Sequence, residues 1–450
     1  MHIKQFEDKN LAHYSYAIMS DCEKKIILID PARNPQQYID FANENKAEII
    51  AVIETHPHAD FVSSHLELHE TLGANIYVSK LAGALYPHQT FDEGQTLQIG
   101  KIKLSALNTP GHSPDSISIL LEHNGKQKAV FTSDTLFIGD CGRPDLRESV
   151  GKIQTTRVEL AKQMYHSLRD KLMPLTDDVF VYPAHGAGTL CGKNLSKESS
   201  STIGEEKKLN WSLQKNTEEE FMRNLLADQP FVPLYFPFDV DLNRKGAIGL
   251  NESINKIKIN HSVNEKFISA LDKNSWIIDT RKEDNFKNGH LPYSINLMED
   301  GKFETWLGSL IKPGKKFYLA SESANHLQTM LERTAAIGYE SQVAKAFVIE
   351  SGPVKEERIN LDAFKYHTED YTIIDVRNIA EVKEGKIFKN SISIPLAEIR
   401  NRVNEIPTDK PIVVHCAGGY RSAVASSLLH SKLCDKANVL DLGEAIKQFL

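Results

Sequence analysis

The chain has 450 residues, of which 41% are hydrophobic and 25% charged, and its formal net charge at pH 7 is −7. That length suggests about three domains of ~150 residues each, and the composition is typical of a soluble globular protein. The acidic balance and the lack of a basic block argue against a nucleic-acid partner. No apolar run is long enough to span a membrane.

The five cysteines are scattered along the chain and odd in number. Such a set argues against a disulfide framework and for a reducing compartment. The first eight residues also lack the apolar segment of a secretory signal. We therefore expect a cytoplasmic protein in which some cysteines are reactive.

Residues 1 to about 178 alternate strand-like and helix-like segments, and one strand end carries an unusual set of donors. The apolar run 49–53 is followed by Thr-His-Pro-His-Ala-Asp-Phe at 55–61. In an extended segment, residues i and i+2 point the same way, so His56 and His58 converge on one point. Imidazole is the commonest protein metal ligand, and Asp60 adds a hard oxygen. The pattern predicts a metal site.

Three further strand ends supply donors. His112 follows a Pro-Gly turn, Asp134 ends the run 129–134, and His185 ends the run 179–185. Each alone is typical of a structural residue. Four donor-bearing strand ends in this order are a specific signal.

These segments resemble the metallo-β-lactamase superfamily, in its Thr-His-x-His-x-Asp loop, Pro-Gly-His turn, Ser-Asp strand end and Pro-x-His-Gly segment. The resemblance implies an αβ/βα sandwich with the metal site at one edge. In the two-metal hydrolases of the family, a histidine occupies the position of Phe61. A phenyl ring cannot coordinate, so we expect the second metal site to be impaired.

The branch that this pattern resembles most is that of the persulfide dioxygenases. The resemblance implies one Fe(II) per chain, held by His56, His112 and Asp134, with three coordination positions open. The remaining donors of the motifs then orient these ligands by hydrogen bonds. They are His58, Asp60 and His185.

Two more residues fit that branch. Arg143, in Gly-Asp-Cys-Gly-Arg-Pro-Asp at 139–145, matches an arginine beside the thiol-persulfide substrate, and a guanidinium suits a carboxylate-bearing thiol. A structural arginine is the alternative. Cys191 resembles a cysteine of the rhodanese-fused members, where it would form a persulfide or mixed disulfide near the iron or be a small buried residue.

A joining region follows. Thr217 and Glu220 have capping-box spacing, which predicts a helix over 217–228. Residues 229–241 contain three prolines among aromatics, which predicts an extended connector. We place the domain boundary near Arg244.

The last two hundred residues contain a repeat. Asp-Thr-Arg at 279–281 recurs as Asp-Val-Arg at 375–377, and Gly-His-Leu at 289–291 recurs as Gly-Lys-Ile at 385–387. The common offset of 96 residues indicates tandem units. Both units resemble rhodanese domains, which implies parallel sheets flanked by helices.

The second unit carries a reactive loop. Cys416 follows the apolar strand 411–415, and Gly418 and Gly419 let the loop curl so that its N–H groups form an anion nest. The helix that begins after the loop adds positive potential, and both features favour a thiolate. Arg421 adds a fixed charge. The four residues between Cys416 and Arg421 fit sulfur chemistry, since related phosphatase loops insert five.

The offset of 96 places Ala320 opposite Cys416, so the first unit is expected to be catalytically silent. The predicted organisation is a metallo-β-lactamase-fold domain with its connector at 1–243, a silent rhodanese-like domain at 244–353 and an active one at 354–450. The fold class is α/β, multidomain.

The resemblance to fused persulfide dioxygenase–rhodanese proteins implies two reactions. A low-molecular-weight thiol persulfide and O2 give sulfite and thiol at the iron, and Cys416 makes or uses thiosulfate in sulfide detoxification. A homo-oligomer is expected, because silent rhodanese copies often supply contacts. The alternatives are a glyoxalase-II-like thioester hydrolase with a sulfurtransferase tail, and a non-enzymatic sulfur-carrier scaffold.

Overall fold

The computed structural model describes residues 1–146, 155–261 and 263–450. The chain forms two compact units. The N-terminal unit comprises Met1–Ser253 with Ala335–Gly338, and the C-terminal unit comprises Ile254–Thr334 with Tyr339–Leu450. The domain limits expected after residues 243 and 353 stay predictions. None of the described helices is long and apolar enough to cross a bilayer.

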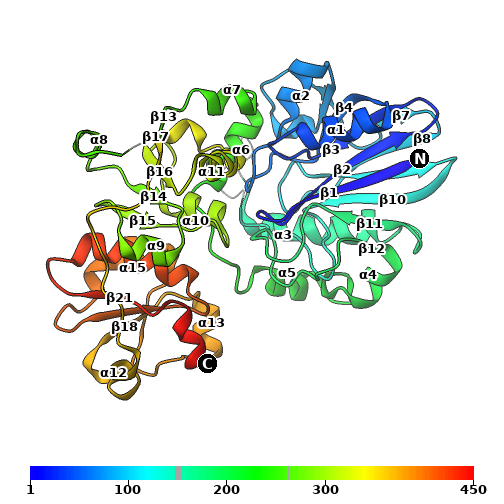
Figure 1. The fold of residues 1–450 in the computed structure, drawn as a ribbon. Helices are drawn as coiled ribbons and strands as arrows, with labels where there is room; N and C mark the ends of the chain where they lie inside the picture. The colour runs from blue at the N-terminus through cyan, green and yellow to red at the C-terminus, as the bar shows by residue number, and fades with distance from the viewer. Residues whose placement is uncertain (147–154, 262) are drawn as a thin grey trace. The chain divides into compact units, whose positions relative to one another are not determined.

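Two six-stranded sheets form the centre of the N-terminal unit (Figure 1). The first sheet has the order β1-β2-β3-β4-β5-β6 and is antiparallel from β1 to β3, then parallel. Its strands are β1 (His2–Asp8), β2 (His13–Ser20), β3 (Lys25–Ile29), β4 (Glu48–Glu54), β5 (Asn75–Val78) and β6 (Gln89–Thr90).

The second sheet has the order β12-β11-β10-β9-β8-β7, and its β10–β11 pair is parallel while the others are antiparallel. Its strands are β7 (Thr96–Ile99), β8 (Ile102–Asn108), β9 (Ile117–His123), β10 (Lys126–Ser133), β11 (Phe180–Pro183) and β12 (Ser201–Thr202). The apolar alternation of β8, with Ile102, Leu104 and Ala106 buried, points one face into the core.

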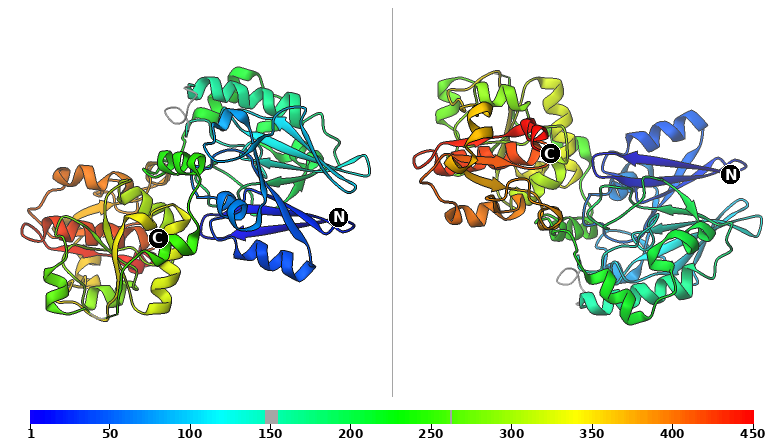
Figure 2. Two further views of the ribbon diagram at one scale, coloured as in Figure 1. Left: turned by 90° about the horizontal axis from the view of Figure 1, so that it is seen from above. Right: turned by 90° about the horizontal axis from the view of Figure 1, so that it is seen from below.

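The two sheets pack face to face, because Ile29 and Ile53 of the first share a buried cluster with Ile119 and Phe131 of the second. Helices cover both outer faces (Figure 2). This arrangement confirms the predicted αβ/βα sandwich. The helices of the unit are α1 (Gln36–Asn45), α2 (His65–Leu72), η1 (Lys80–Ala82), α3 (Arg157–His166), η2 (Ser167–Leu172), α4 (Ile203–Leu209), η3 (Trp211–Leu213), α5 (Glu218–Leu226), α6 (Phe236–Lys245) and α7 (Leu250–Asn255).

The joining region differs in part from its prediction. The capping box is present, since Thr217 Oγ1 accepts from the Glu220 N–H at 3.2 Å and Glu220 Oε2 accepts from the Thr217 N–H at 2.9 Å. The prediction of an extended connector over 229–241 is wrong from Phe236 onward, because the helix α6 begins there. Pro237 lies in the first turn of α6, where a missing N–H costs no helical hydrogen bond.

The C-terminal unit contains two parallel sheets, as the rhodanese resemblance implies. The first has the order β13-β17-β16-β14-β15 and the second β19-β18-β20-β21. The strands are β13 (Ile259–Asn260), β14 (Ile277–Asp279), β15 (Ser294–Asn296), β16 (Phe317–Ser321), β17 (Val343–Val348), β18 (Thr372–Asp375), β19 (Ile392–Ser393), β20 (Ile412–His415) and β21 (Val439–Asp441).

Helices and short 3-10 turns connect these strands. In chain order they are α8 (Glu265–Ser269), α9 (Glu283–Asn288), α10 (Phe303–Leu310), α11 (Ala324–Ala336), η4 (Glu340–Gln342), α12 (Leu361–Tyr366), η5 (Thr368–Asp370), α13 (Ile379–Glu384), α14 (Leu396–Arg402), η6 (Val403–Glu405), α15 (Tyr420–Leu433) and η7 (Gly443–Gln448).

Both repeats use the same internal clamp. Arg281 donates from Nε and Nη2 to Asp279 and from Nη2 to the Gly289 carbonyl. Arg377 makes the matching bonds to Asp375 and to the Gly385 carbonyl, with Nη2 distances of 2.7 and 2.9 Å in both copies. The Asp-x-Arg signal therefore marks a buried ion pair that ties the strand end to the next turn.

The sheet register corrects the position opposite Cys416. Asp279 pairs with Ala320 across β14 and β16, whereas Asp375 pairs with His415 across β18 and β20. Ala320 therefore corresponds to His415, and the counterpart of Cys416 is Ser321. The offset shortens from 96 to 95 residues between the two strands, but the first copy still lacks a thiol at this position.

Replacing Thr217 by alanine removes the side-chain cap of α5. We expect α5 to lose about 1 kcal/mol, or roughly fivefold in local opening, because a helix N-cap contributes that much. Amide hydrogen exchange of residues 218–226, read by mass spectrometry, measures this. Thr71→Ala, at the exposed end of α2, is the matched control and should change little. Unchanged exchange in Thr217→Ala would contradict the role of the cap.

Candidate functional site

Asp30 organises the strand ends that carry the histidine loop. It follows β3, and its carboxylate accepts from the N–H of Thr55 at 2.8 Å and from Thr55 Oγ1 at 2.7 Å. Its Oδ1 also lies 3.2 Å from Nε2 of His58. Burial alone would lower the pKa of His58, but Asp30 outweighs it and raises that pKa to about 9. His58 is thus held toward Asp30.

Three of the predicted ligands converge at the edge of the sandwich. Donor atoms of His56, His112 and Asp134 all lie within 4.8 Å of one another, and the three side chains are buried. Nε2 of His112 is 3.4 Å from Oδ2 of Asp134. The hydroxyls of Thr55 and Ser133 each lie 3.2 Å from Nδ1 of His56 and orient its ring.

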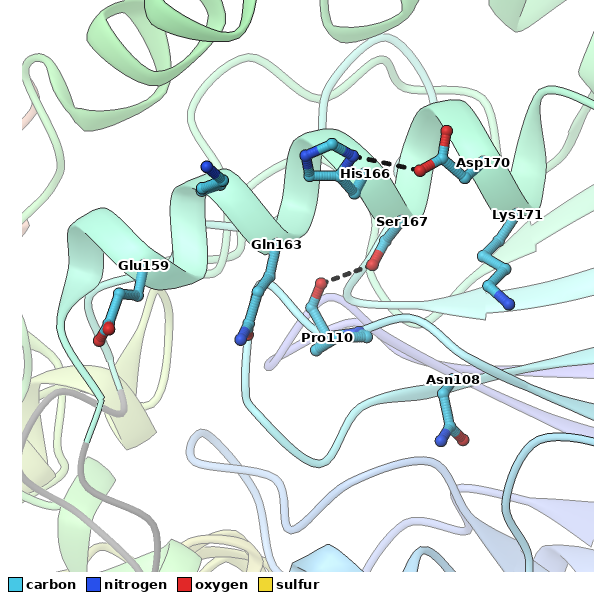
Figure 3. A pocket seen from close by; sticks show the side chains of 9 residues that line it. Asn108, Pro110, Glu159, Gln163, His166, Ser167, Asp170 and Lys171 are labelled. Atoms are coloured by element: carbon cyan, nitrogen blue, oxygen red, sulfur yellow. Dashed lines mark hydrogen bonds and ion pairs between the residues drawn. The ribbon is translucent and has the colours of Figure 1, made fainter.

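The helix α3 and its extension η2 pack against the Pro-Gly turn that carries His112. Ser167 Oγ donates to the Pro110 carbonyl at 2.6 Å, beside a pocket of about 470 Å3 (Figure 3). Gly111 has a φ of +153°, and a Cβ there would lie 2.5 Å from the Cα of Met164. A glycine is required at this close approach.

A similar close approach supports Asp134. A Cβ on Gly142 would lie 1.9 Å from the carbonyl oxygen of Asp134 and 3.2 Å from the Cβ of His112. The Gly-Asp-Cys-Gly-Arg loop therefore packs directly on two predicted ligands. Because this backbone contact admits no side chain, the glycine of the motif has a physical role in positioning them.

The other three predicted donors form a second group in the same place. Donor atoms of His58, Asp60 and His185 also lie within 4.8 Å of one another. Nε2 of His185 is 3.4 Å from Asp60 Oδ2 and 3.5 Å from Asp134 Oδ1, while its Nδ1 donates to the Ala12 carbonyl at 3.2 Å. Two donor triads therefore share one buried centre.

Phe61 lies beside the second triad and offers no ligand atom. Its ring is buried, with its centroid 3.8 Å from that of His13 and 4.3 Å from that of His58. His13, on β2, was missed by the sequence analysis, because nothing in its surroundings marks it as part of a site. Burial, with His185 and His58 nearby, lowers the pKa of His13, so it packs as a neutral ring.

Two positioning residues of the histidine loop come from beyond residue 230 and also gave no sequence signal. Asn243, on α6, donates from Nδ2 to the carbonyls of His58 at 2.9 Å and Phe61 at 2.7 Å, and its Oδ1 accepts from the Ser63 N–H at 2.9 Å. The Tyr235 hydroxyl donates to the Asp60 carbonyl at 3.2 Å. The connector therefore fastens the loop in place.

The donor atoms of this centre fit a metal ion. Both carboxylate oxygens of Asp134, Oδ1 of Asp60 and Nε2 of His185 are buried and receive no hydrogen bond from the residues that the structure describes. Each buried unsatisfied group costs about 1–3 kcal/mol. Burial raises the pKa of Asp60, while His185 and His112 overcome the burial of Asp134 and lower its pKa. A divalent cation would satisfy both carboxylates at once.

Cys191 and Arg143 occupy different surroundings. The sulfur of Cys191 lies within 4.8 Å of donor atoms of Asp134 and His185, and burial raises the pKa of its thiol. Arg143 is buried and donates to both oxygens of Asp145, at 2.7 and 2.6 Å, and to the Leu190 and Pro230 carbonyls. These contacts are structural, so substrate binding by Arg143 stays a prediction.

The C-terminal unit holds the second candidate site. The N–H of Gly419 donates to the sulfur of Cys416 at 3.1 Å, which favours negative charge on that atom. Arg421, on the first turn of α15, binds both oxygens of Glu381 at 2.6 and 2.8 Å. A pocket of about 650 Å3 adjoins the loop, and its lining includes Gly418, Gly419 and Tyr420 from the second copy and Lys282, Met298 and Asp300 from the first.

Comparison with known proteins gives a family match in the N-terminal unit and another in the C-terminal unit. Residues 11–185 match the metallo-beta-lactamase superfamily, and residues 263–352 and 361–449 match the rhodanese-like domain. A crystal structure of a metallo-beta-lactamase from Staphylococcus aureus subsp. aureus COL is 30% identical, covers 77% of this chain and 98% of its own, and has a TM-score of 0.68.

The curated relatives cover about half of this chain. The mitochondrial persulfide dioxygenase ETHE1 of Mus musculus is 29% identical over 231 residues, which are 50% of this chain and 82% of that protein. The hydroxyacylglutathione hydrolase GloC of Haemophilus influenzae is 28% identical over 215 residues, 43% of this chain and 90% of that protein. Similarity thus reaches both a protein named as a dioxygenase and one named as a hydrolase.

Gly418 and Gly419 form a matched pair for testing the thiol loop. Gly419 has a φ of +102°, and a Cβ would lie 2.9 Å from the Glu444 nitrogen, whereas a Cβ on Gly418 meets nothing within 4 Å. We expect Gly419→Ala to slow alkylation of Cys416 by iodoacetamide about tenfold, because the donor N–H is displaced, and Gly418→Ala to leave it unchanged. Mass spectrometry of the labelled peptide measures both rates. Equal rates would contradict the anion-nest geometry.

Proposed function

Because this chain belongs to the metallo-β-lactamase superfamily and carries two rhodanese-like domains, we propose that it is a persulfide dioxygenase joined to a sulfurtransferase. In the first reaction one thiol persulfide, one O2 and one water give one thiol and one sulfurous acid, which ionises to sulfite. The observation that carries the proposal is the buried triad of His56, His112 and Asp134.

The metal proposed for this triad is Fe(II), one ion per chain. Bound there, iron(II) would supply the redox chemistry for O2, since two imidazoles and one carboxylate leave coordination positions open. The residues around the triad orient it. Asp30 fixes Thr55, the Thr55 and Ser133 hydroxyls fix the His56 ring, and Gly142 lets its loop close on Asp134.

Packing on the other side keeps water away from the ligands. The rings of Phe61 and His13 pack beside His58 at a tilt, and the Cys191 sulfur lies next to Asp134 and His185. In this proposal His58, Asp60 and His185 position the ligands, and Cys191 either exchanges sulfur with the substrate or is a small buried residue. A carboxylate-bearing thiol would reach Arg143 only by replacing Asp145.

The second reaction proceeds at Cys416. Its thiolate attacks the outer sulfur of a persulfide, the sulfur–sulfur bond breaks, and the thiol leaves with the proton. Sulfite then attacks the new outer sulfur, forming thiosulfate and restoring the Cys416 thiolate. The Gly419 N–H at the sulfur supports the anionic states. Together the two reactions would detoxify sulfide.

A thioester hydrolase is the second candidate. The intact donor triad of His58, Asp60 and His185 and the similarity to a hydroxyacylglutathione hydrolase both favour it. Two metals would then activate water. Anaerobic reconstitution with Fe(II), followed by O2 uptake with glutathione persulfide, tests the first candidate. Absent uptake together with thioester hydrolysis by zinc-loaded protein would establish the second.

Two variants should separate the half-reactions. His56→Ala removes a ligand of the proposed iron, so we expect loss of O2 uptake with retained thiosulfate sulfurtransfer. Cys416→Ser removes the nucleophile, so we expect the reverse. Ser321→Ala, at the equivalent position of the first copy, is the matched control and should leave both activities intact. Loss of sulfurtransfer in His56→Ala would refute the assignment of separate sites.

The number of bound ions depends on Phe61 in this proposal. Phe61→His places an imidazole beside the second triad, so we expect one ion per chain more than in the unmodified chain after metal loading, measured by inductively coupled plasma mass spectrometry. Phe61→Leu should bind the same amount as the unmodified chain. Equal metal content in Phe61→His and the unmodified chain would count against this role of Phe61.

A further inference from the structure

A second cluster of possible ligands lies in the C-terminal unit, far along the chain from the histidine loop. His290 follows α9 in the first rhodanese copy, Glu356 lies in the segment between the copies, and His430 is on α15 of the second copy. Donor atoms of the three lie within 4.8 Å of one another. Neither reaction proposed above uses any of them.

His290 has the orientation and the charge state of a metal ligand. Its ring stacks on Phe286, with centroids 3.9 Å apart and planes 4° from parallel, and its Nδ1 donates to the Phe286 carbonyl at 3.1 Å. Burial lowers its pKa to about 4, so the ring is neutral at pH 7. With the proton on Nδ1, the lone pair is on Nε2.

The backbone holds His290 and Glu356 in register. His290 and Val354 exchange N–H to carbonyl hydrogen bonds of 2.9 and 3.0 Å, and the Glu356 N–H donates to the Lys287 carbonyl at 3.0 Å. The connecting segment therefore runs as a short antiparallel bridge beside the end of α9. This bridge brings the Glu356 side chain to His290.

The Glu356 side chain offers a buried carboxylate oxygen to a cation. Its Oε1 is buried and receives no hydrogen bond from any residue that the structure describes. Lys287 is held by Glu283 and lies 3.1 Å from Asp441, so it is already paired with two other carboxylates. Burial raises the pKa of Glu356 to about 7. A bound metal ion would supply the contact that Glu356 Oε1 does not receive from the described residues.

His430 completes the set from the opposite copy. Its ring centroid is 6.2 Å from that of His290, with the planes at 78°. The side chain is partly exposed, which gives an ion a path from solvent. Burial also lowers the pKa of His430, so both imidazoles are neutral near pH 7.

We propose that His290, Glu356 and His430 bind a divalent first-row metal ion, with zinc as the best match. Two imidazoles and one carboxylate, with one water, satisfy tetrahedral zinc. The ion would join both rhodanese copies and the segment between them. It would also fix the far end of α15, whose first turn follows Gly419 of the thiol loop. The site is independent of the proposed oxygenase centre.

Zinc titration of the full-length chain against a chromophoric chelator tests this site. We expect His430→Ala to bind one fewer zinc equivalent than the unmodified chain, and Glu356→Gln, which keeps the side-chain shape, to weaken that same equivalent at least about tenfold. His367→Ala, an exposed histidine of the same unit, is the matched control and should bind normally.

Thermal unfolding gives a second readout. Zinc should raise the unfolding temperature of the unmodified chain and of His367→Ala more than that of His430→Ala, because a ligand that binds only the folded state stabilises it. Circular dichroism verifies that each variant is folded. Equal zinc content in the unmodified chain and His430→Ala, or equal loss in His367→Ala, would overturn the proposal.

Discussion

Burial of six ionisable side chains at one edge of a sandwich is the constraint on which the N-terminal unit depends. His56, His58, Asp60, His112, Asp134 and His185 are each at most 5% exposed. Protein interiors tolerate such groups only when charges and lone pairs are matched by partners. Here Oδ1 of Asp60 and Nε2 of His185 receive no hydrogen bond from the residues that the structure describes, which fits a site for a cation.

Three kinds of support keep those side chains in place. Strand ends deliver them, because neighbouring strands β3 and β4, and β10 and β11, run parallel and finish at one edge. Hydrogen bonds from Asp30 and Asn243 fix the histidine loop. Glycines at 111 and 142 permit backbone contacts that any side chain would block. These contacts fix the donor side chains at the strand ends, with the Phe61 ring packed beside them.

The sequence marks the residues that the structure brings together, because their chemistry and their position after apolar strands are local features. The two sheets and the duplicated rhodanese fold are predictable for the same reason. Asp30, His13 and Asn243 are not, since their roles arise from contacts between residues far apart in the chain. The sequence does not predict the helix that begins at Phe236, because Pro237 indicates a helix break. In the structure this proline lies in the first turn of the helix. The second copy is one residue shorter than the first between the Asp-x-Arg segment and the thiol loop. Ser321, and not Ala320, therefore corresponds to Cys416.

The two rhodanese-like copies can be compared with each other position by position. Both copies keep the carboxylate–guanidinium clamp, at the same distances, although only the second carries a thiol at the end of its central strand. The two copies therefore share the fold and the ion-pair clamp, and they differ in the residue at the thiol position. The copy without the thiol lines part of the pocket beside the Cys416 loop, so substitutions at Lys282 or Asp300 should change the shape and charge of that pocket.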